Sequence, residues 1–362
     1  MTAAKRKKRS GFRWLALIVL LICAWSAWEI WRGYAGDTAS FENASANAVR
    51  VVVPRGASVR ETANALAAAE AIRSPRLFRV YAAIGGRDRL IKPGTYQFEK
   101  GAGWRAVLDA LVSGRGVVHT ITIPEGYSLR EIIPLVAKSL SAPEDSVRAA
   151  ATDTTWQRKL DIPIASLEGY LFPATYTFPD GTSAREAIDA MLDAFEAAWA
   201  RVPNAAERLQ ALAISRHDAI TMASIVETEA KKAEERPVIA AVYWNRVRKG
   251  MLLQADPTVQ YALPNHVGRV LFKDLEVNSR FNTYKYSGLP PGPIASPGLP
   301  SIIAALNPAA VSYLYFVADA DGHHEFRTTF AEHEKAIALV KKERSDAKKA
   351  AGRATPKPDR KP

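Results

Sequence analysis

The sequence contains a single cysteine, Cys23, among 362 residues, so no disulfide bond can form within the chain. Its six histidines are scattered without the regular spacing of a metal site. It also has no glycine-rich loop of the kind that holds a phosphate group. We therefore expect neither a metal site nor a cofactor.

The net charge of +12 is confined to the two ends of the chain. Residues 1–13 carry a net charge of +6 without an acid, and residues 341–362 carry nine basic and three acidic side chains, again a net +6. The segment between them is balanced, so the composition indicates no basic surface for nucleic acid. Residues 344–362, rich in Lys, Ala, Arg and Pro, are expected to form a disordered basic tail.

An almost uncharged run of 18 residues, 14–31, follows the basic start of the chain. As a helix it would be about 27 Å long, close to the thickness of the hydrocarbon core of a bilayer. The pattern predicts a transmembrane helix over residues 14–34, with the basic segment 1–13 in the cytoplasm and the rest of the chain exported. A cleaved signal peptide and a lipoprotein anchored at Cys23 are the alternatives. Ile22 stands before that cysteine where a small residue is wanted, which argues against the lipoprotein.

Residues 35–49 are small and polar and are interpreted as a linker, and an internal repeat follows them. Residues 51–61 and 121–131 match at an offset of 70. In both copies a β-branched strand ends at Pro-x-Gly, and a Ser then precedes a Glu by three positions, which is typical of a capping box at the start of a helix. The unit of strand, turn and helix therefore occurs twice.

The first copy opens a region, 50–118, in which a strand, two helices and a second strand are predicted. This order resembles the LysM type of glycan-binding module, and a small packing domain without a ligand is the alternative. Residues 119–343 are expected to form one larger α+β domain, so the predicted fold class is α+β. Within it, the aromatic segment 167–176 either leans on sugar rings or is an ordered loop packed on the core.

A helix in the larger domain carries Glu227 on a face of apolar or small residues, with Asp218 as the expected N-cap. Burial on such a face would raise the pKa of the carboxyl and favour the protonated acid that cleavage of a glycosidic bond requires. Two alternatives stay open. Lys231, four positions on, could form a salt bridge with a solvated Glu227, and Glu229 lies on an equally apolar face.

A second helix is predicted from Pro237 to Gly250, and a proline-containing loop follows it. Amide, hydroxyl and carboxylate groups in this loop are the types that hydrogen-bond the N-acetyl and hydroxyl groups of sugars. Asp256 has the alternative role of a turn former before a proline. The residues interpreted as a substrate wall are Gln254, Asp256 and Thr258.

Short strings from residue 223 onward carry a family resemblance. They include Ala-Ser-Ile-Val-Glu at 223–227, Gln-Ala-Asp-Pro-Thr-Val at 254–259, Asn-Thr-Tyr at 282–284 and Gly-Leu-Pro-Pro-Gly-Pro-Ile at 288–294. In order and spacing, residues 223–340 resemble the catalytic domain of the membrane-bound endolytic murein transglycosylases, the YceG-like or MltG family. The chain departs from the family pattern at His323, where a second glycine is usual, and at Phe281, where a tyrosine is common.

The resemblance implies that Glu227 is the catalytic acid. The family cleaves the β-1,4 bond between N-acetylmuramic acid and N-acetylglucosamine within glycan strands and leaves 1,6-anhydro ends, an action that would terminate nascent strands. Because the attacking hydroxyl belongs to the substrate, one carboxyl suffices. The residues expected to contact the substrate are Gln254, Asp256, Thr258, Asn282, Tyr284 and His324. The residues expected to support the site are Glu229, Asn245 and Arg246.

A purely structural role is the alternative for Gln254, Asn282 and His324. The resemblance also implies a single-pass protein of the inner membrane with its catalytic domain in the periplasm. Its expected partners are peptidoglycan glycan strands, the bacterial cell membrane, and peptidoglycan synthases and division proteins. Two other classes are the alternatives: a non-catalytic, membrane-anchored peptidoglycan-binding scaffold, and a pyridoxal-phosphate lyase, which would need a Schiff-base lysine and a phosphate cup.

Overall fold

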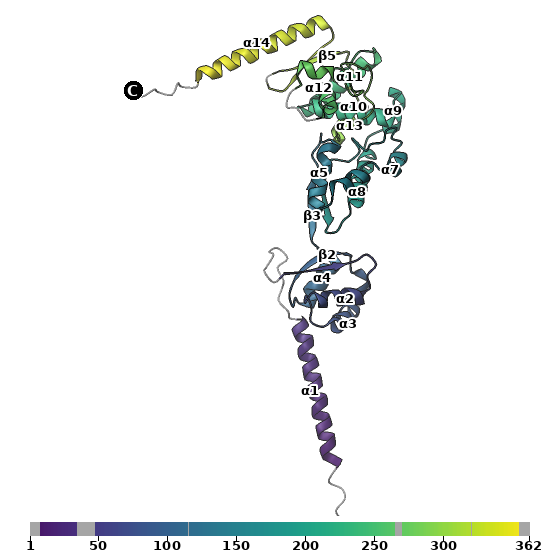
Figure 1. Ribbon diagram of the computed structural model, residues 1–362, viewed down its shortest axis with the longest axis vertical. Helices are drawn as coiled ribbons and strands as arrows, with labels where there is room; N and C mark the ends of the chain where they lie inside the picture. Colours follow the sequence, from purple (N-terminus) through teal and green to yellow (C-terminus); the bar gives the residue numbers. More distant parts are fainter. Residues whose placement is uncertain (1–7, 35–47, 115, 265–269, 320, 355–362) are drawn as a thin grey trace, which may run out of the picture. The chain divides into compact units, whose positions relative to one another are not determined.

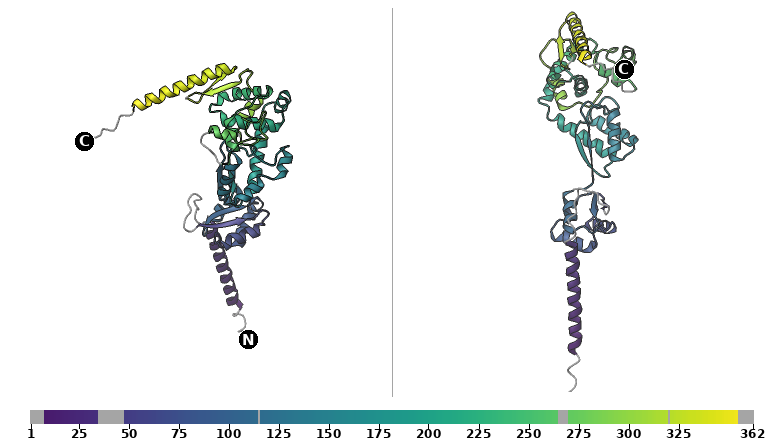
Figure 2. Two further views of the ribbon diagram at one scale, coloured as in Figure 1. Left: turned by 45° about the horizontal axis from the view of Figure 1, so that its top comes forward. Right: turned by 90° about the vertical axis from the view of Figure 1, so that its left-hand side faces the viewer.

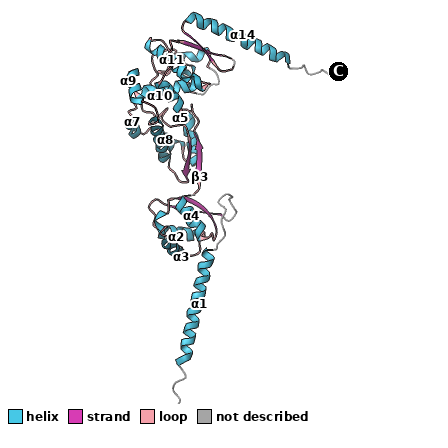
Figure 3. Cartoon of the chain, turned by 180° about the vertical axis from the view of Figure 1, so that it is seen from behind, coloured by secondary structure: helices cyan, strands magenta, loops and turns pink. Residues whose placement is uncertain are grey.

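The computed structural model describes residues 8–34, 48–114, 116–264, 270–319 and 321–354. Helices make up most of this part of the chain, and its strands occur as short pairs (Figure 3). The chain divides into two compact units: Met1–His119 with Thr177–Thr182, and Thr120–Tyr176 with Ser183–Pro362. The mixture of helices and strands agrees with the predicted α+β class.

Helix α1 (Lys8–Tyr34) includes the residues of the expected membrane span (Figure 1). Within the described ranges, however, no helix has the combination of length and apolar character that a membrane crossing requires. The predicted span over residues 14–34 is therefore not confirmed. Residues 1–7 of the basic segment and residues 35–47 of the predicted linker lie outside the described residues.

The first unit contains the predicted order of strand, two helices and strand. Strands β1 and β2 are antiparallel, with Val51 opposite Tyr96, and the side chains of both residues are buried. The core also includes Leu66, Phe78 and Trp104 from the helices. The binding of glycan by this unit stays a prediction. Its elements are β1 (Ala48–Val53), α2 (Val59–Ala68), α3 (Pro75–Ile84), η1 (Asp88–Leu90), β2 (Gly94–Glu99) and α4 (Trp104–Ser113).

Helix α10 (Arg216–Glu229) belongs to the second unit, whose chain runs from blue through green to yellow in Figure 2. Nearly every residue of α10 between His217 and Val226 is buried, which fits its apolar character on all sides. It packs against α11 (Arg236–Arg248) and α13 (Leu299–Leu306), and this packing fixes the place of the last turn of α10.

Strands β3 (Val118–Thr122) and β4 (Thr175–Pro179) pair with each other, and their residues are divided between the two units. The other elements of the second unit are α5 (Leu129–Leu140), α6 (Glu144–Ala150), α7 (Thr154–Lys159), α8 (Ala184–Trp199), α9 (Ala205–Leu212), η2 (Ala233–Glu235), α12 (Asp256–Ala262), η3 (Phe272–Glu276), β5 (Tyr315–Ala318), β6 (His324–Arg327) and α14 (Phe330–Ala354).

Both copies of the repeat form the capping box that the sequence predicts. The backbone N–H of Ser58 donates to Glu61 Oε2 over 2.7 Å, and that of Ser128 donates to Glu131 Oε2 over 2.9 Å. The serine side chains in turn accept from the backbone N–H of the glutamates. The turn before each helix is therefore fixed in the same way in both units.

Two local expectations are wrong. Ser215, rather than Asp218, is the N-cap of α10, because Asp218 stands three positions later and completes a capping box with that serine. The expected disordered tail from residue 344 is helical as far as Ala354, where α14 ends. The Lys, Ala and Arg residues of this segment have high helix propensity, which explains the helix. Residues 355–362 lie outside the described residues.

Candidate functional site

Glu227 lies in the last turn of α10, and its side chain is only 6% exposed. Its Oε2 accepts a hydrogen bond of 2.9 Å from the backbone N–H of Gly298, the residue just before α13. Its Oε1 lies 3.3 Å from Nη2 of Arg236, the first residue of α11. Three elements therefore meet at this carboxyl.

Arg236 supplies the cation at the site. Its Nε donates to Ser301 Oγ over 3.0 Å, and its side chain is 14% exposed. The planar guanidinium thus links α10 to α13 with a fixed orientation. The sequence had pointed to Lys231 as the rival salt-bridge partner of Glu227, whereas the structure supplies Arg236. The surroundings of Glu227 are consequently more polar than its helical face alone suggested.

A second carboxyl, that of Glu125, reaches the same place from the turn after β3. A Cβ atom built on Gly298 would overlap with Glu125 Oε1, and one built on Gly126 would lie 3.9 Å from Glu227 Cγ. Burial, together with the charge of Glu227, raises the pKa of Glu125, and Arg236 opposes that shift. Glu125 was not among the residues that the sequence predicted for the site. The internal repeat could have pointed to it. The first copy has Arg55 at the equivalent position, so the two copies differ in charge there.

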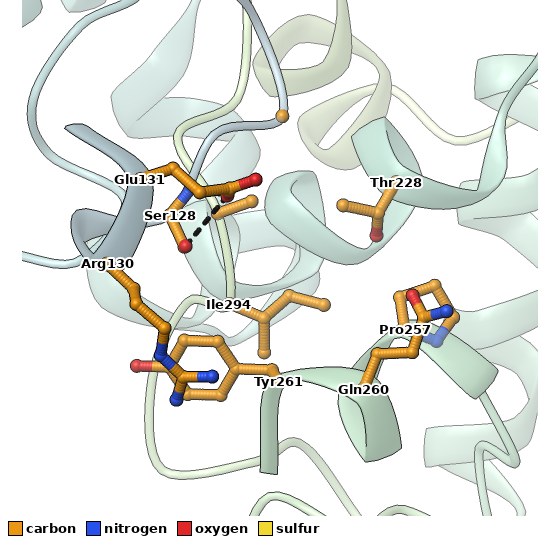
Figure 4. A pocket seen from close by; sticks show the side chains of 10 residues that line it. Ser128, Arg130, Glu131, Thr228, Pro257, Gln260, Tyr261 and Ile294 are labelled. Carbon is orange, nitrogen blue, oxygen red and sulfur yellow. Dashed lines mark hydrogen bonds between the residues drawn. The ribbon is translucent and has the colours of Figure 1, made fainter. Parts of the chain in front are cut away.

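A cavity of about 290 Å³ is lined by Gly126 and by Thr228, the residue that follows Glu227, while Glu227 itself is not part of the lining. Figure 4 shows Ser128 and Glu131, joined by a hydrogen bond of 2.8 Å, on one side and Thr228 on the other. Hydroxyl, amide, guanidinium and aromatic groups share the lining, a mixture suited to a polar ligand with apolar faces. The complete lining consists of Gly126, Ser128, Arg130, Glu131, Thr228, Pro257, Gln260, Tyr261, Ile294 and Ala295.

Glu168 is a buried acid next to this lining. Burial raises its pKa to about 7, although hydrogen bonds from the backbone N–H of Leu129, at 2.9 Å, and from Tyr261 lower it. It belongs to the aromatic segment 167–176, in which Leu167 and Tyr170 are fully buried. Of the two interpretations of that segment, the ordered loop packed on the core agrees with this burial.

Glu229, the rival carboxyl, faces a different group of side chains. Its Oε1 accepts a hydrogen bond of 3.1 Å from the hydroxyl of Tyr243. Burial raises the pKa of Glu229 to about 7. The hydroxyl of Tyr284 donates to Asp256 Oδ1 over 2.6 Å, and the charge of Asp256 acts on Glu229. Glu227 and Glu229 therefore have separate surroundings although they are two residues apart.

The residues expected to form the substrate wall differ in their exposure. Gln254 and Asp256 are exposed, and Tyr284 is half-buried. Thr258 and Asn282 have no exposed surface. The hydroxyl of Thr258 lies 2.8 Å from that of Thr283. Asn282 Nδ2 donates to the carbonyl oxygens of Leu275 and Val277, both over 2.8 Å.

The remaining expected site residues stabilise the backbone around the site. His324 Nδ1 lies 2.7 Å from Glu235 Oε2, and the His324 side chain is 4% exposed. Asn245 Nδ2 donates to the carbonyl oxygens of Val311 and Tyr313. Arg246 donates to the carbonyl oxygens of Leu253 and Leu314. These contacts are structural, and a contact of these residues with substrate stays a prediction.

Comparison with known proteins places this chain in a defined class. A model of the YceG-like family matches residues 51–339, which is most of the chain. The chain belongs to the YceG-like family.

Two named relatives are similar over most of this chain. The endolytic murein transglycosylase of Bacillus subtilis (strain 168) is 38% identical over 311 residues, which cover 82% of this chain and 85% of the relative. The endolytic murein transglycosylase of Streptococcus pneumoniae (serotype 2, strain D39) is 30% identical over 80% of this chain and 58% of its own length. Among solved structures, a crystal structure of a YceG-like protein from Listeria monocytogenes matches with a TM-score of 0.55 and 33% identity, covering 80% of this chain and 99% of that one.

Proposed function

We propose that this chain is an endolytic murein transglycosylase, an enzyme that cleaves peptidoglycan strands internally. The observation that carries the proposal is the 38% identity to the Bacillus subtilis enzyme of that name, over 82% of this chain. The site adds a chemical reason, because Glu227 has little exposure and the next residue, Thr228, lines a cavity with groups suited to sugars. The bond cleaved is the β-1,4 bond from N-acetylmuramic acid to N-acetylglucosamine.

In this proposal Glu227 is the catalytic acid and base. It gives a proton to the glycosidic oxygen as the bond from C1 of the muramic acid to that oxygen breaks. The C6 hydroxyl of the same sugar then forms a bond to C1, and its proton passes to the Glu227 carboxylate. The products are a free hydroxyl on N-acetylglucosamine and a 1,6-anhydro-muramyl end, and the reaction consumes no water.

The hydrogen bond from Gly298 and the contact with Arg236 support this assignment, because they hold the Glu227 carboxyl in one orientation. Gln254 and Asp256 are exposed and Tyr284 is half-buried, so these three residues are the better candidates for direct contact with the glycan. Thr258, Asn282 and His324 are buried, so we assign them the role of keeping the surrounding backbone in place.

Digestion of purified murein by the full-length protein, followed by mass analysis of the new ends, tests the proposal. We expect anhydro ends from the wild type and at least a 100-fold slower release from Glu227→Gln, which keeps the size of the side chain but cannot act as an acid. Reducing ends would indicate hydrolysis instead. An absence of cleavage by a folded wild type would favour the non-catalytic scaffold.

Glu229→Gln is the matched variant for the choice of carboxyl. Because Glu229 faces Tyr243 and lies apart from the contacts of Glu227, we expect cleavage to persist in this variant. Cleavage that survived Glu227→Gln and was lost in Glu229→Gln would reverse the assignment of the catalytic group.

We also propose that α1 anchors the chain in a bacterial inner membrane, with the second unit in the periplasm. Cleavage there would terminate glycan strands near peptidoglycan synthases and division proteins. The exposed apolar side chains of Leu20, Ile22 and Trp25 support the anchor. Extraction of cell membranes at alkaline pH tests it, and release of the full-length chain into the soluble fraction would contradict an integral anchor.

A further inference from the structure

The turn at residues 124–126 brings a second acid to the carboxyl of Glu227. Glu227 Oε2 accepts from the backbone N–H of Gly298 over 2.9 Å, while Glu125 Oε1 occupies the space that a side chain at Gly298 would fill. The two carboxyls are therefore both in contact range of one backbone residue. Glu125 is an exposed residue, whereas the Glu227 side chain is only 6% exposed.

The balance of charge at this place favours a shared proton. Two charged groups act on Glu125: Glu227 at the end of α10 and Arg236 at the start of α11. Next to α13 the neighbouring group is the uncharged N–H of Gly298, which donates to Glu227. One guanidinium can compensate one carboxylate. Two carboxylates that both reach Gly298 would repel each other, so such a pair retains one proton more readily than either acid alone.

We propose that Glu125 is a positioning residue of the reaction centre that acts through Glu227: the two carboxyls share one proton and keep it available for the glycosidic oxygen. This inference rests on the proposed function of Glu227 as the acid. It also explains a difference between the two copies of the repeat. The middle residue of the Pro-x-Gly turn is Arg55 in the first copy and Glu125 in the second.

The direction of the Glu125 pKa supports this arrangement. Burial raises that pKa, the charge of Glu227 raises it further, and Arg236 lowers it without cancelling the shift. Because the interaction between two charges is mutual, removal of the charge on Glu125 also removes a repulsion that acts on Glu227. The alkaline limit of activity should then move to a lower pH.

The test is the pH profile of anhydro-end release by the full-length protein carrying Glu125→Gln. We expect the alkaline limb of kcat/KM to move down by about one pH unit, so that activity falls about tenfold at pH 8 and changes little near pH 5. Glu125→Asp should restore the wild-type limb because it keeps the charge. Glu207→Gln, which removes an exposed carboxyl from the first turn of α9, is the matched control and should leave the profile unchanged.

A merely structural role for Glu125 predicts a different result, an equal loss at every pH that Glu125→Asp does not repair. That result, or an unchanged profile, would overturn the proposal. Gly298→Ala supplies an independent variant, because its Cβ would displace the Glu125 carboxyl while the backbone N–H that serves Glu227 remains. As a single substitution, Gly298→Ala should shift the alkaline limb of kcat/KM. Added to Glu125→Gln, it should cause little further shift.

A second measurement separates this inference from the proposed function. Carbon NMR of labelled glutamate carboxyls, with the Glu125 signal assigned from Glu125→Gln, follows the titration of Glu125 without any need for cleavage. We expect its pKa to fall towards the ordinary value in Glu227→Gln. An unchanged titration would refute the shared proton even if the enzyme is active. If the wild type released no anhydro ends, the proposed activity would be refuted, and this titration would still test the coupling of the two carboxyls.

Discussion

The free energy of local unfolding of α10 should decrease as the pH rises through 7, because Glu229 then loses its proton. Burial raises the pKa of this carboxyl to about 7, and the charge of Asp256 adds to the effect, while the hydrogen bond from Tyr243 and the charges of Arg246 and Lys231 oppose it. In an unfolded chain the pKa is about 4.3. The folded state therefore binds this proton more tightly, so its contribution to stability is complete below pH 4.3 and is lost as the pH rises through 7.

The size of the effect follows from the two pKa values. Their difference corresponds to roughly 3.7 kcal/mol between low and high pH, most of which falls between pH 5 and pH 8. Glu229→Gln removes the titrating group but keeps an oxygen that can accept from the Tyr243 hydroxyl. The cost of the substitution itself should not depend on pH, so the comparison isolates the proton.

Hydrogen exchange of peptides from α10, followed by mass spectrometry in the full-length protein, measures the free energy of opening. We expect the wild type to lose roughly 2 to 3 kcal/mol relative to Glu229→Gln between pH 5 and pH 8, which is close to a 100-fold change in relative exchange rate. Glu207→Gln on the exposed face of α9 should follow the wild type. If the wild type and Glu229→Gln differ by the same amount at every pH, the buried carboxyl is not the source and the reasoning fails.

The remaining predictions concern other parts of the second unit. Glu168→Gln should likewise reduce the loss of stability above neutral pH, by roughly 2 to 3 kcal/mol in hydrogen exchange of α5, because burial raises the pKa of Glu168 to about 7; equal pH dependence in both proteins would contradict this. Gly169→Ala should destabilise the unit by about 2 kcal/mol or more in urea unfolding, since its φ is +82° and its Cβ would overlap with Pro293; an unchanged midpoint would show that the loop adapts. Arg236→Lys should slow anhydro-end release about tenfold, because an ammonium cannot replace the two-sided contact with Glu227 and Ser301, and wild-type rates would refute a positioning role.

Local structure was predictable where the controlling residues are near in sequence. The capping box of Ser128 and Glu131 follows from a spacing of three residues, and it forms as expected. Pro237 marks the start of α11 to within one residue, and Gly250 follows its end with a φ of +66°. Asp218 was misassigned for the same local reason, because Ser215 provides an equally good cap three residues earlier.

The surroundings of Glu227 could not be predicted from the sequence in the same way. Helical periodicity gives the neighbours of Glu227 within α10, but its carboxyl meets groups from other elements. Glu125 is about 100 residues away in the chain, and Gly298 is 71 residues away. Arg236 is near in sequence, yet it lies beyond a turn whose direction only the packing of α11 fixes. The resemblance to a family supplied the identity of the acid, and the structure supplied its neighbours.

The irregular segment around Thr283 has a consequence for the thermodynamics of ligand association. Its backbone carbonyl and hydroxyl accept from the N–H groups of Gln254 and Ala255, and Thr258 and Asn282 complete the internal bonding. In the proposed function this buried segment supports the site with bonds that are already formed, so its own conformational entropy changes little on association. The entropy lost would belong mainly to the saccharide, and longer oligosaccharides should therefore show a more unfavourable entropy in calorimetry while the protein's contribution stays constant.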